Sequence, residues 1–218
     1  ELFDDFLERQ FLCNSGDEHS LAEVCEISSK LIDPRAPEYC DLPHVGAGNM
    51  ITKSDKLIEV KTAKEEGLIS GKFLFDRSMV LYSKIRPYLM KAARPDFDGL
   101  CSADVYPLRP IPELLDRDFL YFWLMTRSFT EYAVQGSDRA GMPKVNRDHL
   151  FKCRLRVPAF SHQRAISDRI DAMSEQTTIL VEVLSKKSAA LLELRNSLLQ
   201  QAFSGQLGST GLLTEAAE

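Results

Sequence analysis

The C-terminal part of the chain carries the most regular pattern of apolar and polar positions. Neither proline nor glycine occurs from Ser161 to Ser204, and Ser161 is a candidate helix cap. Apolar or small residues recur there at spacings of mostly 3 and 4, the near-heptad period of a coiled-coil seam. They are Ile166, Ile170, Met173, Thr177, Leu180, Leu184, Leu191, Leu194, Leu198 and Ala202. We therefore expect a long helix over residues 161–205, about 65 Å long, whose apolar stripe needs a partner helix.

Residues 17–160 carry shorter patterns of mixed type. Turn residues bound extended runs at 56–61, 73–75, 79–82, 100–108 and 150–157, and helices are expected at 21–28 and 116–134. Strands outnumber helices and no regular β–α alternation appears. We therefore expect a single α+β globular domain with a mixed or antiparallel sheet, followed by the coiled-coil-type helix. Residues 206–218 are expected to form a flexible tail.

The two ends of the chain resemble each other. Residues 1–16 align with residues 193–208 with identities at five of sixteen positions, at an offset of 192. One interpretation is a tandem repeat of a domain followed by a long helix, with residues 1–16 as the end of a preceding helix and its loop. The other is that two amphipathic helix ends use the same few residue types.

Composition narrows the class of protein. The chain has 218 residues, a net charge of −5 and 44% hydrophobic residues, which is ordinary for a globular protein and unlike a collagenous or disordered one. No uncharged apolar run approaches the about 18 residues that span a membrane. The chain begins with Glu1, which suggests a fragment or a processed product. Its five scattered cysteines show neither zinc nor disulfide spacing, and we expect a reducing, cytoplasmic setting.

Charge is distributed unevenly along the chain. Residues 1–26 carry eight acidic and one basic residue, residues 77–95 carry five basic and no acidic residues, and residues 136–156 carry six basic and two acidic residues. A polyanion responds to the local field within about 10 Å rather than to the net charge. Two basic stretches on an acidic chain are therefore compatible with a localised DNA-binding face.

The chemistry of both stretches suits nucleic acid. Residues 80–94 interleave bases with aromatic side chains, and lysine and arginine contact phosphates, while arginine also binds guanine bidentately. Residues 136–147 form a loop of glycines, bases and amides whose backbone can approach DNA closely. The plainer alternatives are a solvated basic hairpin and an ordinary surface connection.

Catalytic motifs are sparse. Gly46-Ala-Gly48 lacks the third glycine of a dinucleotide-binding loop, the four histidines show no metal spacing, and we expect neither a cofactor nor a metal. The best enzymatic candidate is Glu59 with Lys61, an acid and a lysine two residues apart on an expected strand, as metal-dependent nucleases require. Alternating charge on an exposed strand explains the same residues.

Four motifs in this order resemble the specificity subunit of type I restriction–modification systems. They are YSKIRPY at 82–88, MPKVN at 142–146, the strand-to-helix junction at 158–166 and QAFSGQL at 201–207. The resemblance extends from about Leu21 to Leu207 and departs at His162, where the family usually has glutamate.

The resemblance implies a target recognition domain at residues 17–160 and a spacer helix at 161–205. Members of this family carry two such domains, each reading one half of a bipartite DNA site, with the two helices packed antiparallel. The helices dock the methyltransferase subunits, through which the restriction/translocase subunit joins. The chain would be either the second half of such a subunit or a half-length subunit that forms a homodimer. On this interpretation it is not an enzyme itself.

The resemblance and the chemistry together predict site residues. Contacts to double-stranded DNA are expected at Lys84, Arg86, Lys91, Arg94, Ser137, Arg139, Lys144 and Asn146, whereas Asp104 and Asp148 are expected to be structural. The interface with the partner helix is expected at Ile166, Ile170, Met173, Leu180, Leu184, Leu191, Leu194 and Leu198. The open alternatives are a scaffold that binds only protein through this seam, and the nuclease that uses Glu59 and Lys61.

Overall fold

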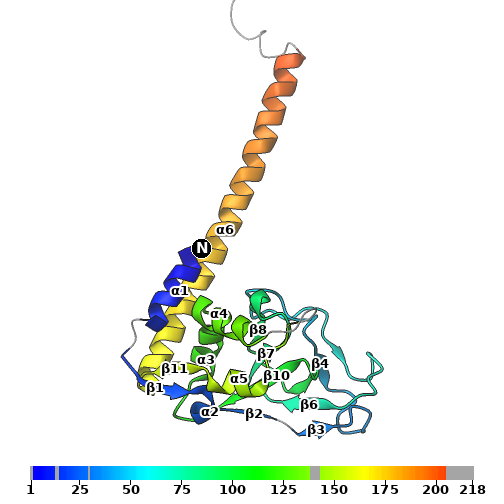
Figure 1. Cartoon of the computed structure of the whole chain (residues 1–218). Coiled ribbons are helices and arrows are strands. Elements are labelled where there is room, and N and C mark those ends of the chain that lie inside the picture. The colour runs from blue at the N-terminus through cyan, green and yellow to red at the C-terminus, as the bar shows by residue number, and fades with distance from the viewer. Residues whose placement is uncertain (1, 13–14, 29, 138–142, 205–218) are drawn as a thin grey trace, which may run out of the picture. The chain divides into compact units, whose positions relative to one another are not determined.

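A computed structural model describes residues 2–12, 15–28, 30–137 and 143–204 of the chain. The chain divides into two compact units, one ending at Ile170 and the other beginning at Asp171. The first unit holds all the strands in the described part of the chain (Figure 1). Its helices are α1 (Leu2–Leu12), α2 (Leu21–Val24), α3 (Arg117–Leu124), α4 (Arg127–Gln135), α5 (Arg147–Lys152), the 3-10 turn η1 (Pro87–Leu89) and the start of α6 (Phe160–Phe203).

The strands of the first unit form three sheets. A two-stranded sheet pairs β1 (Asp17–Ser20) with β11 (Arg154–Val157). A four-stranded antiparallel sheet has the order β2 (Cys25–Ile27), β10 (Val105–Pro110), β7 (Val80–Ser83), β8 (Ala92–Ala93). A five-stranded sheet has the order β3 (Leu31–Ile32), β6 (Lys72–Phe75), β9 (Gly99–Cys101), β4 (Pro43–Val45), β5 (Lys61–Thr62), with β4 and β9 parallel and the other pairs antiparallel.

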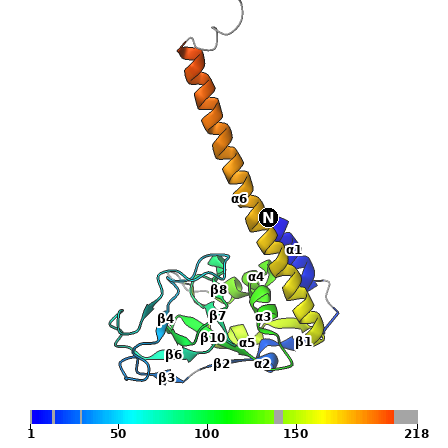
Figure 2. The same ribbon diagram turned by 180° about the vertical axis from the view of Figure 1, so that it is seen from behind.

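Strand β7 lies at the centre of the unit and is buried along its whole length. Its side chains alternate between two cores, as the period of a strand requires. Val80 and Tyr82 belong to the large core that includes the helices, whereas Leu81 belongs to a second core with Phe75 and Cys101. The four-stranded sheet is therefore covered on both faces, which explains why β7 is a continuous apolar run. Helix α3 and strand β4 lie on opposite sides of β7 and β10 (Figure 2).

Helix α6 begins as part of the first unit. Ile166 and Ile170 are buried in the large core, and the fully buried Gln163 fixes the start of the helix. Its amide donates to the carbonyls of Leu114 and Pro158 at 2.9 and 2.8 Å, and its oxygen accepts from the backbone N–H of Asp116. Ile166 and Ile170 are thus core residues, which corrects their expected place on the partner seam.

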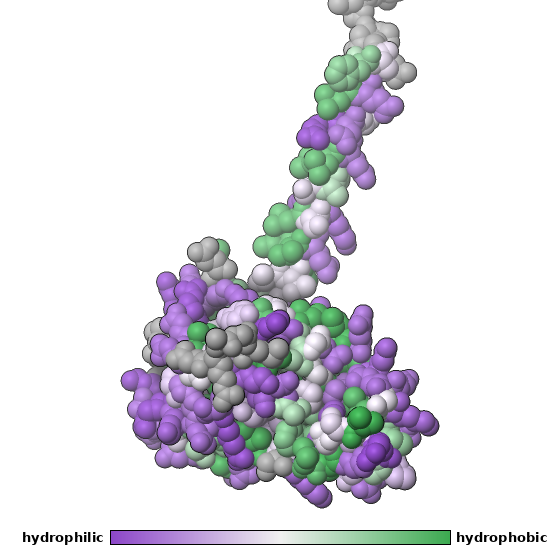
Figure 3. All heavy atoms as spheres, turned by 45° about the vertical axis from the view of Figure 1, so that its right-hand side comes forward, coloured by the Kyte–Doolittle hydropathy of each residue, from purple (hydrophilic) through white to green (hydrophobic). Residues whose placement is uncertain are grey.

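The second unit contains the rest of α6. Its expected seam residues are all exposed, and Figure 3 shows apolar side chains gathered along one side of this helix. The seam that remains open begins at Met173 and comprises Met173, Leu180, Leu184, Leu191, Leu194 and Leu198. Nothing in the described part of this unit covers that stripe. In the described residues, no helix is both long and apolar enough to cross a membrane. The tail expected at 206–218 lies outside the described residues.

The expected α+β class is confirmed, but several expected elements differ. The single helix expected at 116–134 is two helices, because Thr126 ends α3 and begins α4: its hydroxyl donates to the Trp123 carbonyl and accepts from the Phe129 N–H. The helix expected at 21–28 ends at Val24 and continues as strand β2, and the run 100–108 is divided between β9 and β10.

Of two further expected strands, one is confirmed over half of its length and the other is largely wrong. The run 150–157 begins inside helix α5 and becomes strand β11 only from Arg154, since Asn146 caps that helix by accepting from the His149 N–H. The run 56–61 contains an isolated bridge at Leu57 and enters β5 only at Lys61. Glu59 interrupts it with a φ of 51°, a left-handed conformation that an extended strand does not accommodate.

Candidate nucleic-acid interface

The structure brings the two basic stretches of the sequence together. Residues Ile85 and Lys144 form an antiparallel bridge. The backbone N–H of Arg86 donates to the Pro143 carbonyl at 2.9 Å, and the N–H of Val145 donates to the Lys84 carbonyl at 2.8 Å. Two segments separated by about sixty residues of sequence therefore form one continuous edge.

A cleft of about 510 Å³ opens beside this edge. Its lining is rich in groups that bind phosphates and base edges: three cationic side chains, two carboxamides, two hydroxyls and an imidazole. The lining residues are Lys84, Tyr106, Gln135, Gly136, Ser137, Lys144, Val145, Asn146, Arg147 and His149. Of the residues expected to contact DNA, Lys84, Ser137, Lys144 and Asn146 line this cleft.

The lysines of the cleft are tied to one carboxylate. The ammonium of Lys144 lies 3.0 Å from Oδ1 of Asp104, and that of Lys84 lies 4.0 Å from the same oxygen. Lys84 also lies over the Tyr106 ring, 5.3 Å from its centroid, and Tyr106 donates its hydroxyl to the Val145 carbonyl. The two ammonium groups are therefore held near each other on one wall.

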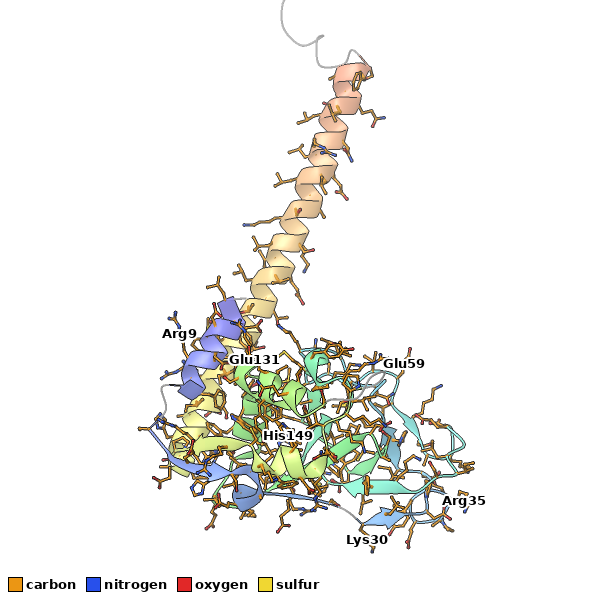
Figure 4. All side chains as sticks on the ribbon, viewed as in Figure 1. Arg9, Lys30, Arg35, Glu59, Glu131 and His149 are labelled. Atoms are coloured by element: carbon orange, nitrogen blue, oxygen red, sulfur yellow. The ribbon has the colours of Figure 1, made fainter. Side chains whose placement is uncertain are left out.

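A stacked pair of rings supports another part of the lining. The rings of Tyr132 in α4 and His149 in α5 stack at 4.1 Å with an interplanar angle of 13°. Each ring also bonds to the other's backbone carbonyl at 2.9 Å. Gly136 is required here, because a Cβ at this position would lie 2.0 Å from the His149 ring. The backbone N–H of His149 (labelled in Figure 4) donates to the side-chain oxygen of Asn146. The stacked ring therefore fixes Asn146 and Arg147 relative to the end of α4.

Some expected contact residues have other surroundings. Ser137 is buried, and its hydroxyl donates to the Val134 carbonyl, so it closes the end of α4. Lys91 donates its ammonium to the Ala47 carbonyl at 3.0 Å and does not line the cleft. Arg86 is exposed in a left-handed conformation (φ of 50°) on the edge itself. Arg139 lies outside the described residues.

Arg94 is enclosed, and we remove it from the candidate interface. Only 12% of its side chain is exposed, and its guanidinium pairs with Asp55 at 2.9 Å and Asp118 at 3.4 Å. Its guanidinium carbon also lies 4.4 Å from the ring centroid of Tyr121 and 4.9 Å from that of Phe122. A guanidinium that contacts two carboxylates and two rings has a structural role at the edge of the core.

The structure does not support the nuclease alternative, which requires Glu59 and Lys61 on one face of a strand. Glu59 and Lys61 do not share a strand, because the left-handed turn at Glu59 breaks the alternation that would place both side chains on one face. Among the described residues, no group of three or more His, Cys, Asp or Glu side chains is placed to hold a metal ion. Glu59 also lies away from His149 of the cleft (Figure 4).

Sequence reasoning missed part of the cleft. The stacking of the Tyr132 ring in α4 on the His149 ring in α5 brings Gln135 and His149 there, and no sequence motif indicates this contact. Arg147 belonged to the second basic stretch, so its charge was a usable signal. Its guanidinium lies 5.4 Å from the Phe151 ring centroid.

Comparison with solved structures defines the class of fold. A chain from a structure of a type I R-M system matches with a TM-score of 0.70 and 18% identity, over 93% of this chain and 50% of that one. The HsdS subunit from Thermoanaerobacter tengcongensis matches with a TM-score of 0.63 and 18% identity, over 94% of this chain and 50% of that one. The fold is thus the fold found in type I R-M systems.

Sequence comparison gives the family. The EcoDI type I restriction enzyme specificity subunit of Escherichia coli is 31% identical over 185 residues, which are 85% of this chain and 40% of that protein. The family model for the type I restriction modification DNA specificity domain matches residues 17–187. The chain belongs to this family. It spans half or less of the length of the relatives it matches.

Proposed function

We propose that this chain is a non-catalytic DNA recognition module of a type I restriction–modification complex, which reads one half of a bipartite site. The observation that carries the proposal is the pairing of residues 84–86 with 143–145, which concentrates cations around one cleft. Phosphate contacts by Lys84 and Lys144 would position the duplex, while the amides of Asn146 and Gln135 are suited to base edges. The module acts in the cytoplasm.

The exposed seam of α6 supports the second half of the proposal. An apolar stripe along a helix in water is stabilised when a second helix covers it. We infer that the stripe from Met173 to Leu198 packs on the helix of a second recognition domain, in the same chain or in a homodimer. The helix pair then docks the methyltransferase subunits, and through them the restriction/translocase subunit.

A paired substitution tests the DNA-binding half. Changing Lys84→Ala and Lys144→Ala together should weaken binding of a fluorescein-labelled duplex of random sequence about tenfold, measured by fluorescence anisotropy. The slope of log affinity against log salt should become shallower by about 0.9 for each phosphate that the variant no longer neutralises. Lys61→Ala with Lys64→Ala removes the same charge from exposed positions outside the cleft and is the matched control.

Equal effects of the two double variants would contradict the proposal. If the unmodified chain does not bind the duplex at all, the scaffold that binds only protein is favoured. Cleavage of the duplex by the 218-residue chain in magnesium would restore the nuclease alternative.

Sedimentation tests the helix half of the proposal. We expect the 24.6 kDa chain, alone or mixed with methyltransferase subunits, to sediment as a larger species. Changing Leu184→Glu and Leu191→Glu should return it to the mass of one chain, because these exposed side chains lie on the seam. A complex that survives both substitutions would rule out the seam as the interface.

A further inference from the structure

The strongest unexplained feature of the cleft is a carboxylate between its lysines. Asp104 lies in the turn between β9 and β10, at the point where the four-stranded sheet meets the cleft wall. Its backbone carbonyl accepts from the Lys84 N–H at 3.0 Å, so the residue is fixed beside the lysine it pairs with. One of its oxygens faces both ammonium groups, Lys144 at 3.0 Å and Lys84 at 4.0 Å.

The carboxylate of Asp104 contributes little to the stability of the fold. The side chains of Asp104 and Lys144 are 41% and 40% exposed, and ion pairs in such positions contribute about 0–1 kcal/mol. Other contacts also place both residues: the Lys84 ammonium lies over the Tyr106 ring, and the Lys144 backbone forms the bridge to Ile85. The fold therefore does not depend on the negative charge to place the lysines.

The electrostatic consequence is larger than the structural one. Two lysines that share one carboxylate present a net charge of about +1 rather than +2 to an approaching phosphate. This lowers affinity for every duplex alike, because phosphates are the same in all sequences. Sequence discrimination is a difference of affinities, so a term common to all duplexes cancels from it, and Asp104 limits the strength of sequence-independent binding rather than the ranking of sequences.

We propose that Asp104 is an affinity-limiting residue, which restrains the phosphate affinity of the Lys84–Lys144 pair and thereby weakens sequence-independent binding to DNA. The inference rests on the proposed function, because it assumes that the cleft receives a duplex. Asp104 does not line the cleft itself, and the proposed effect is exerted through the two lysines that do.

The test is the substitution Asp104→Asn, which removes the charge and keeps a carbonyl oxygen in place. Binding of the fluorescein-labelled random-sequence duplex should become about threefold tighter near 100 mM salt, and the salt slope should become steeper by about 0.9. The matched control is Asp33→Asn, which changes net charge equally by breaking the exposed pair with Arg35. Figure 4 places Arg35 well away from His149 of the cleft.

The outcomes separate this inference from the proposed function. Tighter binding and a steeper slope in Asp104→Asn, with Asp33→Asn unchanged, support it. Weaker or unchanged binding in Asp104→Asn, while Lys84→Ala with Lys144→Ala still reduces affinity, overturns the role of Asp104 and leaves the DNA-binding cleft standing. Unchanged affinity in the double lysine variant would contradict the proposed function itself.

Unfolding followed by the fluorescence of Trp123, the single tryptophan, establishes that each variant is folded.

Discussion

Two groups of basic side chains from the predicted basic stretches have opposite surroundings in the fold. Arg94 lies against two carboxylates and two aromatic rings, and little of it reaches water. Lys84 and Lys144 share one carboxylate and line an open cleft. Both sites look alike in a count of bases along the sequence. The difference shows that a basic residue is available to a polyanion only when its surroundings leave charge uncompensated and exposed.

Removing the enclosed cation should have the largest effect on stability. Arg94→Ala should lower the free energy of unfolding by about 3 kcal/mol, because it removes packing against both rings and the ion pairs with Asp55 and Asp118, of which Asp118 keeps its pair with Arg117. Urea denaturation followed by Trp123 fluorescence measures it. Arg94→Lys keeps the charge without the planar stack and should recover part of the stability. A decrease below about 1 kcal/mol for Arg94→Ala would break the comparison, since Arg94 would then not be structural.

A substitution in the cleft wall should have a smaller effect on stability. Gly136→Ala should cost about 2 kcal/mol, because the new Cβ would overlap the His149 ring. It should also weaken duplex binding, since the ring positions Asn146 and Arg147. Gly48→Ala is the control, because nothing lies within 4 Å of its Cβ position. If both variants unfold at the same urea concentration as the unmodified chain, the stacked pair does not support the lining.

The smallest effect on stability is expected for Lys91. This residue lies in the same β7–β8 hairpin as Lys84, so it sharpens the comparison between cations inside and outside the cleft. Lys91→Ala should cost about 1 kcal/mol of stability, because it removes the hydrogen bond to the Ala47 carbonyl. Duplex affinity should change by less than about twofold, because an ammonium bound to a carbonyl outside the cleft contributes little to phosphate binding. Affinity that falls as far as in Lys84→Ala would instead extend the interface along the hairpin.

Local sequence signals predicted the elements that local forces decide. The apolar run at 79–82 overlaps strand β7 (Val80–Ser83), and the absence of proline and glycine after Ser161 marks helix α6. The same signals failed where side chains or backbone strain intervene. Thr126 divides one expected helix into two, and Glu59 turns an expected strand into a left-handed bend.

The candidate site was only partly predictable, because its geometry depends on non-local pairing. Composition identified both basic stretches, but nothing in the sequence says that Ile85 bridges to Lys144. Period alone also assigned Ile166 and Ile170 to the partner seam, whereas both are buried in the first unit's own core. An apolar stripe indicates that a helix face needs a covering neighbour, but its period does not say whether that neighbour is the unit's own core or another helix.

Lysine acetylation footprinting with and without duplex tests the central claim most directly. The account predicts that DNA protects Lys84 and Lys144 from acetylation, while the exposed Lys61 and Lys64 react equally in both states. Protection of Lys61 and Lys64 with no change at Lys84 and Lys144 would contradict it, because the duplex would then lie outside the cleft.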